Sequence, residues 1–420
     1  MRVSESRRAT RTMRGFVDEP LDGWTRSSVY AFAVIGNNLP DLDFTYAGIS
    51  GKTFGYLLQH RGYSHTLPAA LGFAAAMLGV LLLLARWRKK TLPRADWPML
   101  AAVALVSPLL HIAMDFANNY GVHPFWPVYD GWFYGDSFFI LEPSFWLVLI
   151  APLSFSYRFR PLRVVLWLIL GVALVALWYR ALVPRSHALV LSALTLSLLS
   201  LARRRSARTR MLMAASGFVV LGAAFVLGSR LAKAEVRAQA QLLYPSATVL
   251  DIVVTPMPAN PFCWSALLVS QDDGKYSVRL GRAATWPAWL NLRECPFDRD
   301  ATPTAPLQPL ASSADARVLL LSEYRVAVAD LRSIADARCE ARAFFRFARV
   351  PYLTAIEPDG SRVLGDLRYD RKRGLDFSDI RLTPEPGSCP RYVPPWRPPR
   401  ADIVSVDGQA SRLSIPETRD

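Results

Sequence analysis

The sequence lacks the motifs on which several common enzyme classes depend. It contains no Ser nucleophile elbow, no glycine-rich loop that would cradle a phosphate, and no CxxC pair. Chemistry based on an activated serine, a P-loop or a CxxC site is therefore not indicated. Histidine is scarce too, with five residues in a chain of 420. Four of the five lie between positions 60 and 123, so this stretch is the first place to look for a site.

Cysteine is also scarce, and its four residues, Cys263, Cys295, Cys339 and Cys389, all lie in the C-terminal half of the chain. The hydrophobic N-terminal part has none. An even number of cysteines confined to a domain in an oxidising compartment predicts two disulfides, for which three pairings are open. The alternative is four buried, reduced thiols in a cytosolic domain.

Hydrophobic residues make up 52% of the chain, and between about 66 and 230 they form long blocks. A membrane-spanning helix needs about 20 mainly apolar residues. One block, 187–202, is shorter than this. The segment 28–50 starts apolar and turns polar at Asn37, which indicates a partly inserted helix that breaks near one membrane face. The blocks that are long enough to span are 66–85, 97–116, 138–156, 164–183 and 211–230.

Basic residues outnumber acidic ones and give a net charge of +15. Such a charge can indicate nucleic acid binding. However, the clusters at 86–90, 158–163 and 203–210 adjoin apolar blocks, where basic residues mark the cytoplasmic side. If these clusters and the one at 7–14 lie inside, successive crossings carry the part after about 235 outside. We therefore expect membrane lipid as a partner and no nucleic acid. No cleavable signal peptide is expected, because the first 26 residues lack an apolar core.

Carboxylates and imidazoles, the ligands of zinc, manganese and non-haem iron, gather in three short motifs. In the first, Pro40 disfavours a continuing helix and lets Asp41 and Asp43 present their carboxylates to one side. A capping turn is the alternative for this pair. In the second, a glycine between His60 and His65 permits a bend that brings the imidazoles together. A polar loop whose histidines face water is the alternative there.

The third motif is His111 with Asp115, whose spacing places both on one face of a helix. They can bind one ion together, or the carboxylate can orient the imidazole, although an intrahelical hydrogen bond is the alternative. Arg61, beside the start of the next helix, would complete a phosphate seat. His123 lies in an aromatic loop and is interpreted as an accessory residue.

All of these residues are expected near the outer face of the membrane. Asp136 and Glu142 lie close enough in the sequence to join them, although loop solvation and helix entry are the simpler interpretations. His187 stands alone between two spans and is interpreted as an interfacial residue.

In this order, Pro40-Asp41-Leu42-Asp43, the stretch from His60 to Thr66, His111-x3-Asp115 and Tyr120-Gly121 resemble the YdjM-type (LexA-regulated) family of inner-membrane metal-dependent hydrolases. The later run from Pro256 to Trp264 resembles the extracytoplasmic tail of longer members. The family is more distantly similar to zinc-dependent phospholipases C and single-strand nucleases.

The resemblance implies a multi-pass protein of a bacterial-type inner (plasma) membrane. It also implies one or two divalent ions, zinc by preference. One departure is that members usually begin with a Thr-His pair, whereas Thr25-Arg26 stands here. His123 would then substitute, or the site would hold fewer ions. The metal ligands implied are Asp41, Asp43, His60, His65, His111 and Asp115.

The part after about 235 predicts a β-rich domain, with strands at 249–255, 264–270, 276–280 and 318–329. A hairpin is expected from 344–355 to 362–369 around the Pro-Asp-Gly turn at 358–360. This part contains no histidine, since the last one in the chain is His187, so a cap, lid or partner-binding role is expected. The expected organisation is a basic segment 1–27, an α-helical polytopic membrane domain 28–235 with five to seven helices, an extracytoplasmic β-rich domain 236–390, and a poorly ordered Pro/Arg-rich tail 391–420.

Together these features predict a membrane-bound metal-dependent hydrolase. The expected substrate is a phosphoester in an amphiphilic or lipid-linked molecule, with Asp41 or Asp43 as general base and Arg61 stabilising anionic charge. His123 is a further catalytic candidate. The alternative is a non-enzymatic membrane protein that uses the cluster to bind or transport metal or protons. A partner-recruiting stress-response protein is the third hypothesis.

Overall fold

The computed structural model divides the chain into two compact units. The first consists of the described residues up to Phe116 together with Val122–Phe133, and the second of Ala117–Gly121 and the described residues from Tyr134 onward. The residues that the structure describes are 23–45, 52–157, 159–179, 183–290, 292, 295, 307–310, 317–369, 375 and 377–404.

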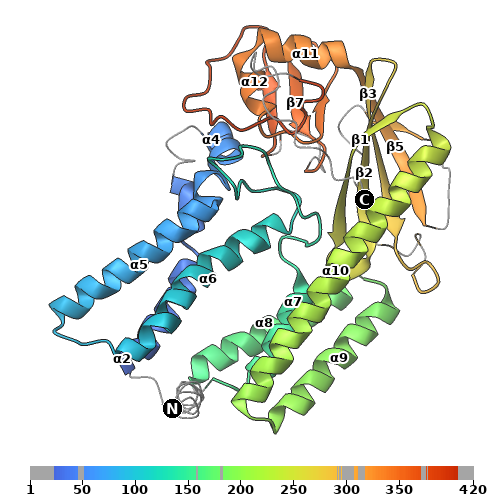
Figure 1. The fold of residues 1–420 in the computed structure, drawn as a ribbon. Helices are drawn as coiled ribbons and strands as arrows, with labels where there is room; N and C mark the ends of the chain where they lie inside the picture. Colours follow the sequence, from blue (N-terminus) through green and yellow to red (C-terminus); the bar gives the residue numbers. More distant parts are fainter. Residues whose placement is uncertain are drawn as a thin grey trace, which may run out of the picture. The chain divides into compact units, whose positions relative to one another are not determined.

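The first unit is helical, and its three main helices pack around a small apolar core (Figure 1). Thr66 caps the longest of them: its hydroxyl accepts from the Ala69 amide, and Pro68 follows in the first turn. The elements are α2 (Gly23–Gly36), η1 (Pro40–Asp43), α4 (Lys52–Gln59), η2 (Tyr63–His65), α5 (Leu67–Trp87), η3 (Arg94–Asp96) and α6 (Trp97–Phe116).

Helices α2 and α6 run in the same direction and lie close together. The Thr25 hydroxyl, near the start of α2, donates to Asp96 Oδ2 just before α6, at 2.7 Å. The Asn37 carbonyl, just after α2, lies 2.6 Å from His111 Nδ1 near the end of α6. A Cβ atom at Gly36 would lie 2.7 Å from that of Ser107, so the close approach of α2 to α6 requires glycine at this position. One end of this unit therefore holds η1, η2 and the last turns of α6.

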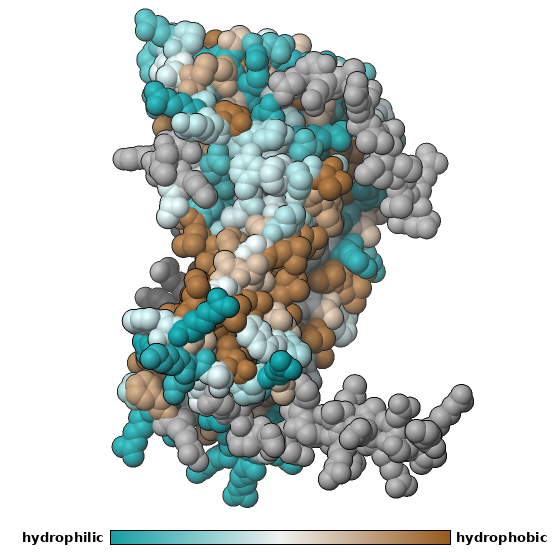
Figure 2. Space-filling model, turned by 60° about the vertical axis from the view of Figure 1, so that its left-hand side comes forward, coloured by the Kyte–Doolittle hydropathy of each residue, from teal (hydrophilic) through white to brown (hydrophobic). Residues whose placement is uncertain are grey.

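The N-terminal part of the second unit is formed by α7 (Pro143–Leu153), α8 (Arg160–Tyr179), α9 (Arg185–Arg203) and α10 (Ala207–Leu243). Figure 2 shows hydrophobic side chains gathered over helical parts of the molecule. Across both units, the described helices long and apolar enough to cross a membrane are Leu67–Trp87, Arg94–Phe116, Arg160–Trp178, Arg185–Arg203 and Ala207–Leu243.

Two of the expected spans differ from the structure. The marginal block 187–202 forms a full helix of 19 residues, α9. The block 138–156, expected to be a spanning helix, is helical over only 11 residues, from Pro143 to Leu153. Proline at the first helical position and Glu142 as N-cap, which accepts from the Ser144 amide, fix this late start.

The block 138–156 nevertheless runs along α10. The ring of Phe138 lies 6.1 Å from that of Phe225, and the Phe155 carbonyl accepts from Arg210 Nη1 at 2.6 Å. The start of this block, before Pro143, is not helical. The Phe138 amide in it is nevertheless hydrogen-bonded, because it donates to the Ala117 carbonyl.

The C-terminal part of the second unit forms two antiparallel sheets, as the strand-rich sequence predicted. The first has the order β1-β2-β3-β5-β4 and the second the order β6-β7-β8. The strands are β1 (Thr248–Met257), β2 (Asn260–Asp272), β3 (Lys275–Ala284), β4 (Gln308–Pro309), β5 (Val318–Ala327), β6 (Pro351–Leu353), β7 (Arg362–Asp366) and β8 (Asp379–Leu382).

Three local expectations in this part were wrong. Residues 328–344, expected in part as strand, form α11 (Val328–Ala337) and α12 (Cys339–Phe344), so the hairpin begins only at β6. The described part of the expected poorly ordered tail, residues 391–404, packs against the domain, and residues 405–420 lie outside the described residues. Trp396 is fully buried, and its carbonyl accepts from Arg346 Nη1 at 2.9 Å. A large buried indole outweighs the disorder that a Pro/Arg-rich composition favours.

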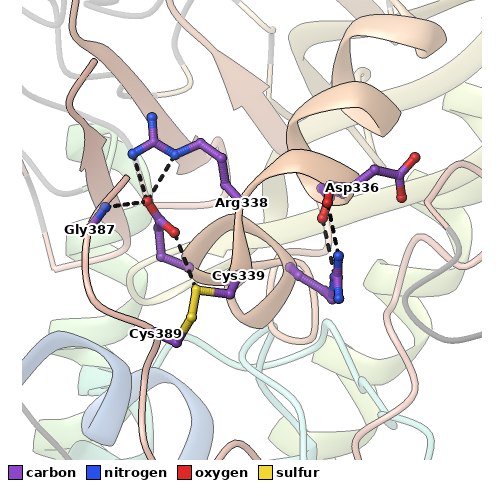
Figure 3. The surroundings of a disulfide bond; sticks show 8 residues. Asp336, Arg338, Cys339, Gly387 and Cys389 are labelled. Carbon is purple, nitrogen blue, oxygen red and sulfur yellow. Dashed lines mark hydrogen bonds and ion pairs between the residues drawn. A yellow bond between two sulfur atoms is a disulfide. The ribbon is translucent and has the colours of Figure 1, made fainter. Parts of the chain in front are cut away.

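Both disulfides are present, and they fix the pairing that the sequence left open. Cys263 bonds to Cys295, and Cys339 bonds to Cys389. Figure 3 shows the second bond, where Glu340 beside it accepts from Arg338 and from the Gly387 amide. The start of α12 is thereby fastened to the segment that follows β8.

Candidate metal centre

Four side chains of the first unit converge at the end that holds η1 and η2. His65 closes η2, and Asp41 lies in η1 directly after Pro40. His111 and Asp115 face them from the last turns of α6. The three sequence motifs, which are up to 74 positions apart, thus meet at one place, as the sequence predicted.

The ligand atoms of this group lie close together. His65 Nε2 is 3.3 Å from His111 Nε2 and 2.9 Å from Asp115 Oδ2. His111 Nε2 is 3.3 Å from the same Asp115 oxygen. Asp41 Oδ1 lies 3.4 Å from His111 Nε2 and 3.7 Å from His65 Nε2. The four atoms all lie within 4.8 Å of one another and could hold a metal ion.

Both imidazoles are oriented by bonds to their other nitrogen. His111 Nδ1 lies 2.6 Å from the Asn37 carbonyl, which can only accept, so Nδ1 carries the proton. His65 Nδ1 lies 3.0 Å from the Ser64 hydroxyl and 3.2 Å from Asp43 Oδ2, to which that hydroxyl also donates. In both rings Nε2 is directed into the group, where its lone pair can bind a metal ion once the ring is neutral. Orientation of a ligand imidazole by a carboxylate or a carbonyl is typical of metal sites.

Asp43 is the centre of the hydrogen bonds around this group. Its Oδ2 accepts from the Arg61 amide at 2.8 Å and from the Ser64 hydroxyl at 2.7 Å, besides His65. Its Oδ1 lies 2.9 Å from His60 Nδ1. Both oxygens are therefore engaged by donors, and Asp43 is almost fully buried. The geometry favours Asp43 as the residue that positions the histidines.

His60 belongs to a second, overlapping group with Asp41 and Asp43 that could also hold an ion. Its ring stacks on Phe44 at 4.3 Å and on Tyr56 at 5.1 Å. Because the Asp43 oxygens already accept several hydrogen bonds, this group is less suited to a metal than the first.

Arg61 and Asp115 form an ion pair at the edge of the group. Arg61 Nη2 lies 2.9 Å from Asp115 Oδ1, so the other oxygen, Oδ2, remains directed at the two histidines. Arg61 is buried, and its backbone has a φ of 59°. Its guanidinium therefore orients a ligand carboxylate, and its amide binds Asp43.

His123 lies beside Arg61 and is outside both groups of metal-ligating side chains. Its Nδ1 is 3.3 Å from the Arg61 carbonyl, and its ring contacts that of Trp132 at 4.0 Å. Burial lowers the pKa of His123 to about 3, so the ring is neutral at physiological pH. His123 therefore contacts the backbone of Arg61 at the point where its φ is positive, which indicates a positioning role for His123.

The net charge in and around the group depends on whether the imidazoles carry their protons or are neutral, as they are when they bind a metal ion. Burial raises the pKa of Asp41 and Asp43, but their bonds to the neighbouring histidines outweigh this and hold both pKa values below the ordinary range. Burial lowers the pKa of His65, and the carboxylates of Asp115, Asp41 and Asp43 outweigh it and raise that pKa to about 10. With neutral imidazoles, three carboxylates and the guanidinium of Arg61 leave two net negative charges. This balance suits a divalent cation.

The remaining candidates lie elsewhere. Glu142 caps α7, and Asp136 pairs with Lys233 and Arg349 in the second unit. Thr25 lies at the start of α2, and the group lies at the end of α6, which runs parallel to it. The 14 residues of α6 between Trp97 and His111 span roughly 21 Å. A histidine beside Thr25 would therefore not reach the group, and its absence removes no ligand.

The fold and this group define the class: a multi-helix membrane protein with a His/Asp cluster and a β-rich C-terminal domain. Residues 12–185 match the model of the family described as YdjM inner membrane protein, which confirms the resemblance over that part of the chain.

Among curated proteins, the uncharacterized protein YfhP of Bacillus subtilis (strain 168) is 25% identical over 130 residues. The alignment covers 31% of this chain and 37% of YfhP, so it spans well under half of that relative. No solved structure matches.

Proposed function

We propose that the chain is a membrane-bound, metal-dependent hydrolase with one zinc ion held by Asp41, His65, His111 and Asp115. The observation that carries this proposal is the set of distances within the group. A tetrahedral ion about 2.1 Å from each ligand atom places those atoms roughly 3.4 Å apart. Five of the contacts within the group, at 2.9 to 3.7 Å, agree with this spacing.

The residues around the ligands would do the rest of the chemistry. A bound zinc ion supplies an acidified water molecule and polarises a phosphoryl oxygen. Asp41 has the most exposed ligand side chain, at 39%, and can accept a proton from the attacking water at its second oxygen. Asp43 is less suited as the base, since donors occupy both of its oxygens. Arg61 holds Asp115 in place, and His123 holds Arg61.

An amphiphilic phosphoester is the substrate class that the surroundings favour. Around the exposed edge of the group, apolar side chains on η1 and η2 are open to the exterior: Leu42, Phe44 and Tyr63 are all exposed, as is Leu67 at the start of α5. An alkyl chain can lie against such side chains while its headgroup reaches Asp41. Ligands gathered at one end of the helices favour hydrolysis over transport, which would need ligands staggered along the spans.

We further propose that the group and the β-rich domain face the extracytoplasmic side of the inner membrane. In the first unit, the basic residues Arg86, Arg88, Lys89 and Lys90 lie at the C-terminal end of α5, opposite the group. In the second unit, Arg210 at the start of α10 lies against Ala202 and Phe155, whereas Gly228 lies against the sheet at Pro261. Basic ends mark the cytoplasmic side, and disulfides are typical of oxidising compartments.

Hydrolysis can be tested with matched substrates. Purified protein loaded with zinc is expected to cleave long-chain phosphoesters faster than the same headgroups without a chain. Asp41→Asn is expected to lower kcat on the long-chain substrate by about 10²- to 10⁴-fold, since it removes the proposed base. His187→Gln, which changes a histidine outside the group, serves as the control. Absence of cleavage of every phosphoester by the zinc-loaded protein would favour the metal-binding alternative.

The role of Asp43 can be separated from that of a ligand. We expect Asp43→Asn to weaken zinc binding by about 10- to 100-fold, because a carboxylate that orients a ligand histidine contributes on this scale. Affinity is measured by competition with a chromophoric chelator. Asp130→Asn, another carboxylate of the same unit, should leave the affinity unchanged. If Asp43→Asn binds zinc as tightly as the unaltered protein, the orienting role is wrong.

A further inference from the structure

A cluster of aromatic side chains lies at one edge of the β-rich domain. The ring of Phe262, on β2, is 5.8 Å from that of Trp286 and 5.1 Å from that of Trp289, and the two indoles are 5.6 Å apart. Trp286 is 53% exposed and Trp289 is 39% exposed. Two large indoles side by side on a surface are costly in water, which indicates that something other than water covers them.

The position of this cluster relative to the helices is fixed within the second unit. His187, in the first turn of α9, lies 5.7 Å from Trp289 and 6.0 Å from Phe262. Its Nε2 lies 2.9 Å from the Ala259 carbonyl, in the turn between β1 and β2. Helix α9 is long and apolar enough to span a membrane. The indoles therefore lie at the level where this helix enters the bilayer.

The segment that carries the indoles is held in place. The Thr285 amide donates to the Phe262 carbonyl at 3.0 Å, and the Leu290 amide donates to the Trp286 carbonyl at 3.0 Å. The disulfide between Cys263 and Cys295 ties the segment to β2. With these attachments, the indoles are presented outward by a fixed scaffold.

We propose that Trp286 and Trp289 insert into the boundary between lipid headgroups and acyl chains, in the leaflet nearest the β-rich domain. Trp is enriched at this depth because its ring is apolar and its N–H is polar. Lipid is favoured over a protein partner because the cluster continues the membrane interface at α8 and α9. Trp178, on the last turn of α8, is 45% exposed and donates to the Ser192 hydroxyl of α9. The domain is thereby anchored to the lipid surface independently of any hydrolysis.

The full-length protein in phosphatidylcholine nanodiscs allows a direct test. After incorporation of 5-fluorotryptophan, Trp286→Phe and Trp289→Phe each identify one ¹⁹F signal. Phosphatidylcholine with a nitroxide at carbon 5 should then abolish both signals, and a water-soluble gadolinium chelate should leave them largely intact. The signal of the fully buried Trp396, identified in the same way, should survive both agents.

The other outcomes contradict the proposal. Signals lost with gadolinium and retained with the nitroxide lipid would show that the indoles face water. Signals retained with both agents would show that protein, such as a second copy of the chain, covers them. The spectra are those of the unaltered protein, so a variant that folds poorly affects only the assignment.

Discussion

Replacing His65 and His111 together by alanine is expected to abolish stoichiometric zinc binding. Each contributes an Nε2 that points into the group, and the two nitrogens lie only 3.3 Å apart. Loss of both leaves two carboxylates, of which Asp115 is already paired with Arg61. Carboxylates alone favour harder ions such as magnesium or calcium. Elemental analysis of the protein purified in mild detergent should find about one equivalent of zinc in the unaltered chain and a trace in the double variant.

The control for this experiment is His187→Gln. It removes a histidine from the second unit, where the side chain bonds to the Ala259 carbonyl, and glutamine can still donate there. This variant should retain its zinc. Zinc kept by the double variant would place the ion elsewhere. No metal in the unaltered protein, even after reconstitution with zinc, would contradict the metal centre altogether.

The candidate site could be predicted from the sequence because its members carry strong local signals. His111 and Asp115 share a helical face at a spacing of four, and Pro40, directly before Asp41, disfavours continuation of the preceding helix, which ends at Gly36. Their convergence in the structure follows from the parallel run of α2 and α6. The sequence could not separate ligands from positioning residues. Asp41 and Asp43 look equivalent in the chain, and only the hydrogen bonds show that Asp43 is occupied by donors.

The fold could be predicted from the sequence to a similar degree, and each wrong prediction has a physical cause. Apolar length predicted most of the spans, but Pro143 and the Glu142 cap shortened α7. Composition predicted a disordered tail, yet the tail buries Trp396. Periodicity predicted the strands of the main sheet, and α11 was missed because its Val328 start continues a β-rich run. In each case a cap or a tertiary contact outweighed the local pattern.

The long-range contacts of Arg349 and Arg368 could not be predicted, because each binds one partner that is more than 200 residues away in the sequence. Arg368 Nη1 donates to the Asn119 carbonyl at 2.7 Å, and Arg349 pairs with Asp136. Asn119 and Asp136 lie on either side of the segment 122–133, which carries His123. The C-terminal part of the second unit therefore holds the chain where it enters that segment and where it leaves it.

The largest loss of stability is expected from Arg349→Ala. Arg349 is buried and binds Asp136 with both Nη atoms, at 2.7 and 2.9 Å. Its Nε donates to Asp251 on β1 at 2.8 Å, and its guanidinium lies over the ring of Tyr134. Among the described residues, the two carboxylates then keep one ion pair each, Asp136 with Lys233 and Asp251 with Arg400 at 3.8 Å. Breaking a buried pair from one side lowers the free energy of unfolding by about 3–5 kcal/mol.

The midpoint of thermal unfolding, followed by circular dichroism in detergent, measures this effect. Arg317→Ala is the matched control, because Arg317 pairs with Glu235 at an exposed position, where a pair contributes about 0–1 kcal/mol. Arg349→Lys keeps the positive charge but loses the bidentate contact with Asp136. Its midpoint of unfolding should therefore lie between those of Arg349→Ala and Arg317→Ala. If Arg349→Ala unfolds at the same temperature as Arg317→Ala, the buried network around Arg349 does not hold the second unit together.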